Sequence, residues 1–509
     1  MDDTAGLSVL QDIKNAWHSR PLDVHRWSDH KELVGVVDQV WQAHCTHLAA
    51  QGRSGPKPRQ DFRYQLRVLL LDLYVAWLED SDLCVGVSMS ENAWHTGSRY
   101  NALSISKKII ELIYLLRDVG LIVLSKGSYS GPLAPGNRTT RIRAAEPLRA
   151  MFRAAKATRD DVYQVIDQEC IILKKGEAED EKSKLLWYED TDETNRMRAE
   201  LQAYNLLLAD TFIDIPTLEE PWIERDNGRG GKNRVLIDHH HHFVRRIFSR
   251  GNWGLNGRFY GPWWQQIGSD WRAEIFINDT PTVEVDYKGL HIQILSAEKD
   301  VVLQGDPYEL PKGLIPGAPA KLQRTVIKKL VLTALNARDL KSACAAFRDS
   351  FSESHMAKEM TNKELEALLT RFIEKHPHLE DCLCTDQGIR LMNVDARIAE
   401  IVLRRLTAAR IPVLSVHDSF IIDYTRVEQL KWTMMLASNQ VTGHALPVDQ
   451  YDQGLDDFSK ELKANLNFEN WRETERSRGY LLRLKTWEER KRRVIIPYRT
   501  AYRSSTLST

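Results

Sequence analysis

The spacing of apolar and polar residues divides the chain into stretches of different character. From 61 to 79, apolar residues recur three and four positions apart with charged residues between them, which predicts a long amphipathic helix. Residues 155–215 are polar and helical in pattern, and from about 280 short apolar runs typical of strands alternate with helical segments. The pattern therefore predicts an α+β protein that is mostly helical.

The segment from 103 to 144 has the pattern of a helix followed by a β-hairpin. A helical run ends near Gly120, and a short apolar strand, a turn rich in glycine and proline, and a returning strand follow it. This order is the one at the end of a winged helix, so we expect a winged-helix-like domain. Basic residues on it are candidate nucleic-acid contacts: Lys107, Lys108, Lys126, Arg138, Arg141 and Arg143. A charged surface for protein partners is the alternative, because winged helices also bind proteins.

Composition adds limits to this picture. Of the 509 residues, 42% are hydrophobic and 28% charged, which excludes a disordered chain and allows about three domains. No apolar run is long enough to span a membrane and the N-terminus lacks the pattern of a secretory signal, so we expect a cytoplasmic protein. The 70 basic and 70 acidic residues cancel, so any basic surface must be local.

Two local features are notable for their charge. Residues 471–509 hold eleven Lys and Arg against four Asp and Glu, interleaved with aromatic residues, as in a surface that follows a nucleic-acid strand. Four consecutive histidines, His239 to His242, cannot all face one metal ion from a regular element. We expect these histidines to divide between the surface and the core.

The most informative segments carry carboxylates beside apolar strands. Asp286 ends a short β-type run, and His417, Asp418 and Ser419 lie between two apolar half-strands at 411–424. Buried charges cost several kcal/mol unless they are paired or bound to metal, so these groups need a partner. Between them, a predicted helix at 324–338 places basic side chains on one face. Each aspartate alone could be a cap or part of a salt-bridged turn, but together the segments favour a site for a metal ion and a triphosphate.

These segments resemble the motifs of a known family. Asp286-Tyr287 followed by GLHIQIL, then Arg324 with Lys328, then His417-Asp418-Ser419, resemble motifs A, B and C of the family A DNA polymerases and the related single-subunit phage and mitochondrial RNA polymerases. The segment NGRFYGPWWQQIGSDWR at 256–272 is similar to the Gly-Arg segment that precedes motif A. The resemblance covers about residues 235–430. We find no match to a proofreading exonuclease in the first 230 residues.

The resemblance implies a right-hand fold of palm, fingers and thumb, and a role for each matching residue. Two Mg²⁺ ions, or Mn²⁺ in their place, would be held by Asp286, Asp418 and the backbone carbonyl of Tyr287. Lys328 would bind phosphate and protonate the leaving pyrophosphate. The other implied nucleotide contacts are Arg324, Lys329, His291, Leu332 and Asn336, and the implied contacts to the template-primer duplex are Arg258 and His417.

The chain departs from the family at two positions of the nucleotide site. Asn336 and Ala337 stand where the family usually has Tyr followed by Gly, so the surface that stacks on the nascent base pair is lost. His291 stands at the position that is typically Glu in the DNA polymerases and Gly in the RNA polymerases. An imidazole there is bulky enough to crowd a 2′-hydroxyl.

The sequence thus predicts a template-directed nucleotidyltransferase that binds a template-primer nucleic acid, most simply DNA, and nucleoside triphosphates. The alternatives are a single-subunit RNA polymerase or primase-like enzyme, and a nucleic-acid-binding factor without catalytic activity. The expected parts are a helical N-terminal segment at 1–55, a winged-helix-like domain at 56–158, a thumb-like region and linker at 159–235, a palm at 236–300 and 396–470, fingers at 301–395 and a basic C-terminal region at 471–509.

Overall fold

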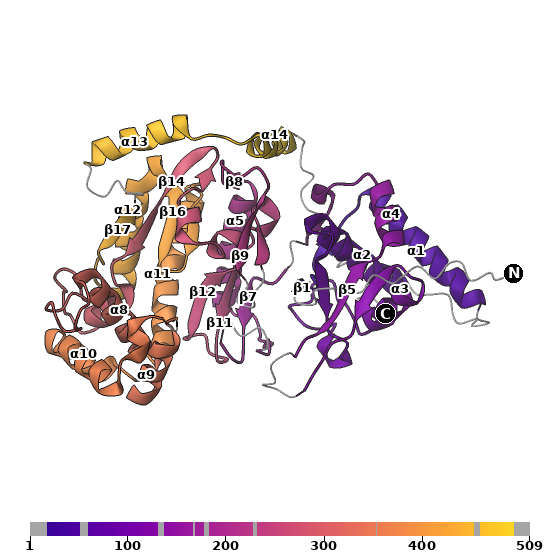
Figure 1. Cartoon of the computed structure of the whole chain (residues 1–509). Coiled ribbons are helices and arrows are strands. Elements are labelled where there is room, and N and C mark those ends of the chain that lie inside the picture. Colours follow the sequence, from indigo (N-terminus) through magenta and orange to yellow (C-terminus); the bar gives the residue numbers. More distant parts are fainter. Residues whose placement is uncertain are drawn as a thin grey trace. The chain divides into compact units, whose positions relative to one another are not determined.

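The computed structural model describes residues 18–50, 60–130, 137–165, 168–177, 183–226, 232–352, 354–451 and 459–492. These residues form two compact units, one ending at Glu169 and the other comprising Cys170–Arg492 (Figure 1). Each unit mixes helices with mostly antiparallel strands, in agreement with the predicted mixture of the two. Within the described ranges, we find no helix with the length and apolar character needed to cross a lipid bilayer.

The first unit packs helices against a small sheet. Its helices are α1 (Lys31–Ala50), α2 (Gln60–Glu79), α3 (Lys108–Asp118) and α4 (Glu146–Ala154). The sheet has the order β1-β3-β5-β4, made of β1 (Ser19–Pro21), β3 (Cys84–Val87), β4 (Ile122–Ser125) and β5 (Thr140–Ala144), while β2 (Arg26–Trp27) pairs with β6 (Tyr163–Gln164). The predicted order of helix, strand and returning strand is confirmed by α3, β4 and β5.

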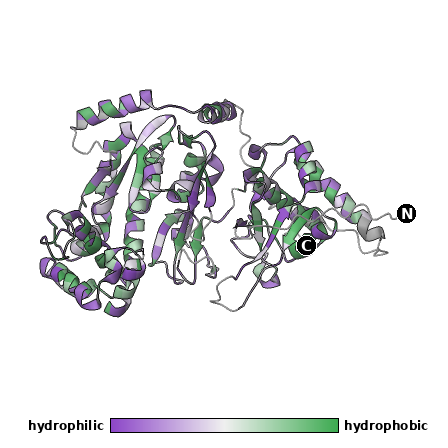
Figure 2. Ribbon diagram, viewed as in Figure 1, coloured by the Kyte–Doolittle hydropathy of each residue, from purple (hydrophilic) through white to green (hydrophobic). Residues whose placement is uncertain are grey.

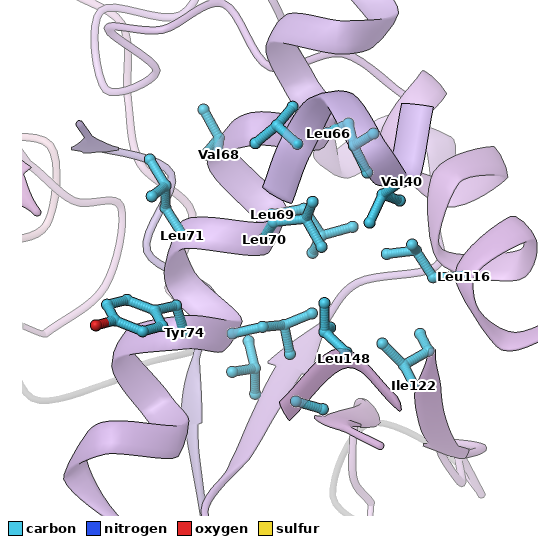
Figure 3. Packing of buried hydrophobic residues seen from close by; sticks show 14 of the residues in the cluster. Val40, Leu66, Val68, Leu69, Leu70, Leu71, Tyr74, Leu116, Ile122 and Leu148 are labelled. Carbon is cyan, nitrogen blue, oxygen red and sulfur yellow. The ribbon is translucent and has the colours of Figure 1, made fainter. Parts of the chain in front are cut away.

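Helix α2 is the centre of this unit's core. The amphipathic run predicted at 61–79 forms it, and Leu66, Leu69 and Leu70 on it are at most 1% exposed. They pack with side chains from the other elements, including Leu116 of α3 and Ile122 of β4 (Figure 3). Burying one such leucine contributes about 1.5–3 kcal/mol, so this cluster is the main source of the unit's stability.

The chain can turn from α3 into β4 because of a glycine. Gly120 has a φ of +72°, in the left-handed region that residues with a Cβ rarely adopt. The strands β4 and β5 then pair in antiparallel register, with Leu124 opposite Ile142. Residues 131–136 in the connection between them lie outside the described residues.

The second unit is built on an antiparallel sheet of order β15-β16-β14-β13-β8, in which β17 also pairs with β14. Its strands are β8 (Ile213–Asp214), β13 (Phe276–Ile277), β14 (Thr280–Tyr287), β15 (Leu414–Val416), β16 (Ser419–Asp423) and β17 (Val448–Tyr451). Smaller sheets contain β7 (Ile171–Leu173), β9 (Trp222–Asp226), β10 (Lys232–Leu236), β11 (Arg245–Phe248) and β12 (Asn256–Tyr260). Figure 2 shows the hydrophobic residues on the central strands of this sheet.

Some helices of the second unit pack against its strands, and three others pack on one another. They are α5 (Asp192–Ala209), α6 (Ser269–Arg272), α7 (Leu290–Ala297), α8 (Ala320–Asn336), α9 (Leu340–Asp349), α10 (Asn362–Lys375), α11 (Gly388–Ala408), α12 (Val427–Thr442), α13 (Lys460–Glu473) and α14 (Arg478–Arg492). Helices α8, α9 and α10 pack on one another. Helix α11 packs against α5, α7, α12 and β12, so it connects most layers of the unit.

Residues 471–492 pack on the second unit through some of their side chains. Tyr480 is fully buried, and its ring lies 5.6 Å from that of Phe212. Arg483 donates to both oxygens of the buried Asp214, at 2.8 and 3.0 Å. Arg483 is therefore used within the fold, whereas Arg472, Arg478 and Lys485 are exposed; contact of this part with a nucleic-acid strand stays a prediction. Residues 493–509 of the predicted basic region lie outside the described residues.

The four consecutive histidines divide as predicted. His239, His240 and His241 form a partly exposed 3₁₀ turn, whereas His242 is buried. The Nδ1 atom of His242 lies 3.2 Å from the carbonyl of Leu208. Burial lowers the pKa of His242 to about 3, so this ring is neutral near pH 7.

Candidate active site: a cleft lined by carboxylates

Two neighbouring strands bring Asp286 and Asp418 to one place. Asp286 is the last residue but one of β14 and lies opposite Ser419 of β16 in the antiparallel register. Asp418 precedes Ser419 in the turn between β15 and β16, where Val416 pairs with Ser419. The turn therefore has only two residues, and His417 within it has a φ of +57°. A tight turn of this kind fixes the direction of Asp418 relative to β14.

A cleft of about 810 Å³ contains both aspartates. Its wall is formed by β14, the 416–419 turn, α6 and the segment that follows it, residues 216–217, one face of α13, and Lys328 of α8. Of the residues singled out in the sequence, Asp286, Lys328, His417 and Asp418 line it. Three segments far apart in the sequence thus supply a mixed acidic and basic surface to one cavity.

The electrostatics of Asp286 show how concentrated the negative charge is. Burial, followed by the charges of Asp418 and Asp449, raises the pKa of Asp286 to about 7, although Lys328 acts in the opposite direction. Its Oδ1 atom is buried and has no hydrogen-bond partner among the described residues. A buried carboxylate oxygen without a donor, beside another carboxylate, is a suitable ligand for a hard divalent cation such as Mg²⁺. The residues present therefore fit the metal that the sequence implied.

Sequence reasoning missed two further acidic residues near the aspartates. Glu284 lies two positions before Asp286 on β14 and lines the same cleft. Its carboxylate accepts a 2.5 Å hydrogen bond from the hydroxyl of Ser419 and pairs with Arg272 at 3.0 and 3.2 Å. The alternation of strand residues was a signal that could have found Glu284. Asp449 lies on β17, directly opposite Asp286 of β14. The two strands are far apart in the sequence, so no local pattern predicts this pairing.

Helix α8 presents its basic residues in two directions. The Lys328 ammonium and the Arg324 guanidinium lie 5.9 and 6.0 Å from the ring centre of Tyr308. Arg324 is ion-paired with Asp306 and does not line the cleft. Lys329 instead lies 5.9 Å from the ring centre of Phe351. The helix therefore supplies Lys328 directly to the cleft, and Arg324 stands beside it on the same face.

The other predicted nucleotide contacts lie outside the cleft lining. Asn336, exposed at the end of α8, donates to the carbonyl of Leu332 at 2.7 Å. The side chain of Asn336 also fills the space next to Gly388, where a Cβ would approach its Oδ1 to 1.7 Å. Tyr287 is buried beside Asp286, and its hydroxyl donates to the carbonyl of Met434 at 2.6 Å.

Arg258 and His291 share one buried carboxylate. Asp395 of α11, whose side chain is 1% exposed, accepts from Arg258 Nε at 3.0 Å and lies 3.2 Å from Nε2 of His291. Neither the arginine nor the histidine lines the cleft. The ring of Tyr260, two residues after Arg258, contacts that of His417 at 5.4 Å between centroids. The network therefore contacts the 416–419 turn through Tyr260, although neither Arg258 nor His291 lines the cavity.

The basic residues predicted to contact nucleic acid in the first unit are Lys107, Lys108, Lys126, Arg138, Arg141 and Arg143. Lys126 is exposed on the end of β4. Lys107 is exposed and pairs with Glu91 at 2.7 Å. Arg143 is 9% exposed and ion-paired with Asp82, which removes it from an open surface. The hairpin therefore offers fewer available charges than its sequence indicates.

Comparisons with known proteins give little beyond this geometry. No protein-family model matches the chain. No curated protein matches it either. Among solved structures, the chain is similar to the POL domain of Pol1 from M. smegmatis in complex with DNA primer-template and dNTP, at 9% identity and a TM-score of 0.28. This alignment covers 83% of the present chain and 66% of that chain. Similarity of this degree does not identify the function, so the assignment below rests on the cleft.

Proposed function

We propose that this protein is a metal-dependent, template-directed nucleotidyltransferase whose active centre is the cleft that contains Asp286 and Asp418. The supporting observation is the meeting of these two carboxylates with Lys328 in one cavity. Phosphoryl transfer requires little covalent chemistry from a protein and depends on positioning and on neutralising charge. Two carboxylates for metal ions and a cation for phosphate are the groups that this reaction needs.

Each residue of the cleft has a role in the proposed reaction. Two Mg²⁺ ions, when bound, would supply activation of the attacking hydroxyl and neutralisation of charge on the leaving pyrophosphate. Asp286 and Asp418 would hold these ions through their carboxylate oxygens, together with the backbone oxygen of Tyr287. Lys328 binds the phosphates and donates a proton to pyrophosphate as it leaves. His417, next to Asp418 in the turn, contacts the end of the primer.

The finer assignment is a DNA polymerase of the family A type without a proofreading domain. The order of the segments along the chain supports it: Asp286 ends a strand, a basic helix follows, and Asp418 stands in a hairpin that pairs with that strand. In this assignment the central sheet forms the palm, helices α8 to α10 form the fingers and the region around α5 is thumb-like. Arg324 joins Lys328 at the triphosphate once it leaves Asp306.

We further propose that the first unit contacts nucleic acid in the manner of a winged helix. The succession of α3, β4 and β5, with β3 pairing β5, supports this proposal. Lys126, Arg138 and Arg141 on the hairpin are the residues best placed for phosphate, because Arg143 is buried against Asp82.

Primer extension tests the function. The purified full-length protein is incubated with a labelled primer-template, with dNTPs and NTPs in parallel, with and without Mg²⁺. We expect metal-dependent extension that is lost in Asp286→Asn and in Asp418→Asn, because both groups act on the transition state. Asp423→Asn is the matched control: this residue ends β16 and bonds to Thr425 outside the cleft, so extension should persist.

The same assay distinguishes the alternatives. Extension from NTPs, or initiation without a primer, would replace the DNA polymerase assignment with the RNA polymerase or primase-like one. Binding of the primer-template without any extension would favour a nucleic-acid-binding factor that lacks activity. Extension that survives in both aspartate variants would exclude the cleft as the active centre.

A further inference from the structure

Asp395 is the most deeply buried carboxylate near the cleft that the proposed mechanism does not use. It lies on α11, and its Oδ1 and Oδ2 atoms are each 3.0 Å from Nε of Arg258, with a further contact from the terminal nitrogen of that arginine. His291 of α7 approaches the same carboxylate at 3.2 Å. One anion therefore holds side chains from two other elements, and the arginine contacts it through Nε and one terminal nitrogen.

Arg258 is close to the catalytic turn. In β12 alternate residues share a face, so Arg258 and Tyr260 point to the same side. Tyr260 contacts the ring of His417, which is the neighbour of Asp418. Burial alone would lower the pKa of Arg258, but Asp395 and then Asp418 keep it above its ordinary value. The guanidinium therefore lies within electrostatic reach of two carboxylates and is hydrogen-bonded to only one of them.

The two carboxylates have different consequences for metal binding. A guanidinium forms strong, two-point contacts with a carboxylate, and a cation so placed occupies the oxygen atoms that a metal ion needs. An arginine deprived of its buried partner cannot remain unpaired without a large cost and turns to the nearest other anion. Among the other carboxylates, Asp418 is the one whose charge acts on Arg258, and its neighbour His417 contacts Tyr260, which shares a face of β12 with Arg258.

We propose that Asp395 is a positioning residue that holds Arg258 away from Asp418 and so keeps this catalytic carboxylate available to a divalent metal ion. The proposal rests on the proposed function, since it assumes that Asp418 is a metal ligand. It explains why a carboxylate is buried at this position of α11 although it does not line the cleft. His291, as the third member of the network, contacts the same Oδ2 atom of Asp395 as the terminal nitrogen of Arg258 does.

Binding of Mn²⁺ alone tests the proposal without any measurement of activity. The full-length protein is titrated with Mn²⁺ by isothermal calorimetry, and free Mn²⁺ is followed by electron paramagnetic resonance. We expect Asp395→Asn to weaken binding about tenfold, the effect of one charge-assisted contact competing for Asp418. The double variant Asp395→Asn/Arg258→Gln should regain the affinity of the wild type, because the competing cation is gone. A purely structural role of Asp395 would not produce this recovery.

Controls separate this inference from the function on which it rests. Glu400→Gln is matched to Asp395→Asn, since Glu400 also lies on α11 and pairs with a buried arginine, Arg246, at 3.0 Å. It should leave the affinity for Mn²⁺ unchanged. Equal affinity for Mn²⁺ in the wild type and Asp395→Asn overturns the proposal, and so does weak Mn²⁺ binding by the double variant. If Asp395→Asn fails to fold, the double variant keeps the test valid, because it buries no unpaired charge. Loss of Mn²⁺ binding in Asp286→Asn and Asp418→Asn supports the metal site. A wild type that does not bind Mn²⁺ refutes both proposals.

Discussion

Replacing Asp286 by Asn should make the metal-free protein more stable at pH 8. In the folded chain, burial and the charges of Asp418 and Asp449 raise the pKa of Asp286 from its ordinary value of 3.8 to about 7. The folded state therefore binds this proton more tightly than the unfolded state does. The stability that the proton provides is fully present below about pH 4 and is lost as the pH rises to about 7. Asn carries no charge at any of these pH values and loses nothing.

The size of the effect follows from this difference in pKa. A change from 3.8 to about 7 corresponds to about 4 kcal/mol if it acts in full. Asp286 is only partly buried, and screening by water reduces the contribution, so we expect about 1–2 kcal/mol. For a unit of this size, that is a rise in melting temperature of about 1.5–3 °C at pH 8. At pH 4 the two proteins should melt at nearly the same temperature.

Thermal unfolding in EDTA, followed by circular dichroism at pH 4 and pH 8, measures this difference, and addition of Mn²⁺ at pH 8 provides the second half of the test. Ligands that bind only the folded state raise its stability, so Mn²⁺ should stabilise the wild type and leave Asp286→Asn unchanged. Asp423→Asn serves as the control for the loss of an acidic residue on the neighbouring strand. A variant that melts below the wild type at pH 8, or that is stabilised equally by Mn²⁺, would refute the electrostatic account of the cleft.

Three other predictions follow from the structure. Removal of residues 471–509 should lower the melting temperature, because Tyr480 and its neighbours are buried against the second unit; an unchanged melting temperature with a smaller salt dependence of template binding would contradict this. Replacing Lys126 by Glu should reduce the slope of log K against log salt for a labelled duplex by about 1, and an unchanged slope would exclude it as a phosphate contact. Replacing Gly388 by Ala should destabilise the protein in urea unfolding by about 1 kcal/mol and should be rescued by Asn336→Ala, since the three atoms nearest to the new Cβ all belong to the Asn336 side chain; the absence of rescue would count against this contact.

Local patterns predicted the parts of the fold that depend on neighbouring residues. The period of α2 and the stop at Gly120 are properties of a few adjacent positions, and both were readable. Lys328 and Arg324 lie four residues apart and share a face of α8, as predicted, whereas Lys329 follows Lys328 directly and is turned about 100° away from it. The helical period of the sequence already contained that distinction.

The parts that the sequence did not predict depend on contacts between distant segments. Asp449 reaches Asp286 only because β17 pairs with β14. Asp395 sits in a helical pattern with no local sign of its partners, and its meeting with Arg258 depends on how α11 packs on β12. Neither partner could be inferred without the register of the sheet or the packing of that helix. The two aspartates of the site could therefore be predicted from their positions at strand ends. The residues that support them became apparent only from the fold.

The pairing of β14 with β16 has a consequence for how the protein is made. Synthesis proceeds from the N-terminus, so Asp286 leaves the ribosome long before the hairpin that carries Asp418, with helices α7 to α11 between them. During this interval β14 has neither of its neighbours β16 and β17, and contacts so distant in sequence form slowly. A nascent chain can therefore bury Asp286 only after β17 has emerged. This delays assembly of the proposed metal site until synthesis of the second unit is nearly complete.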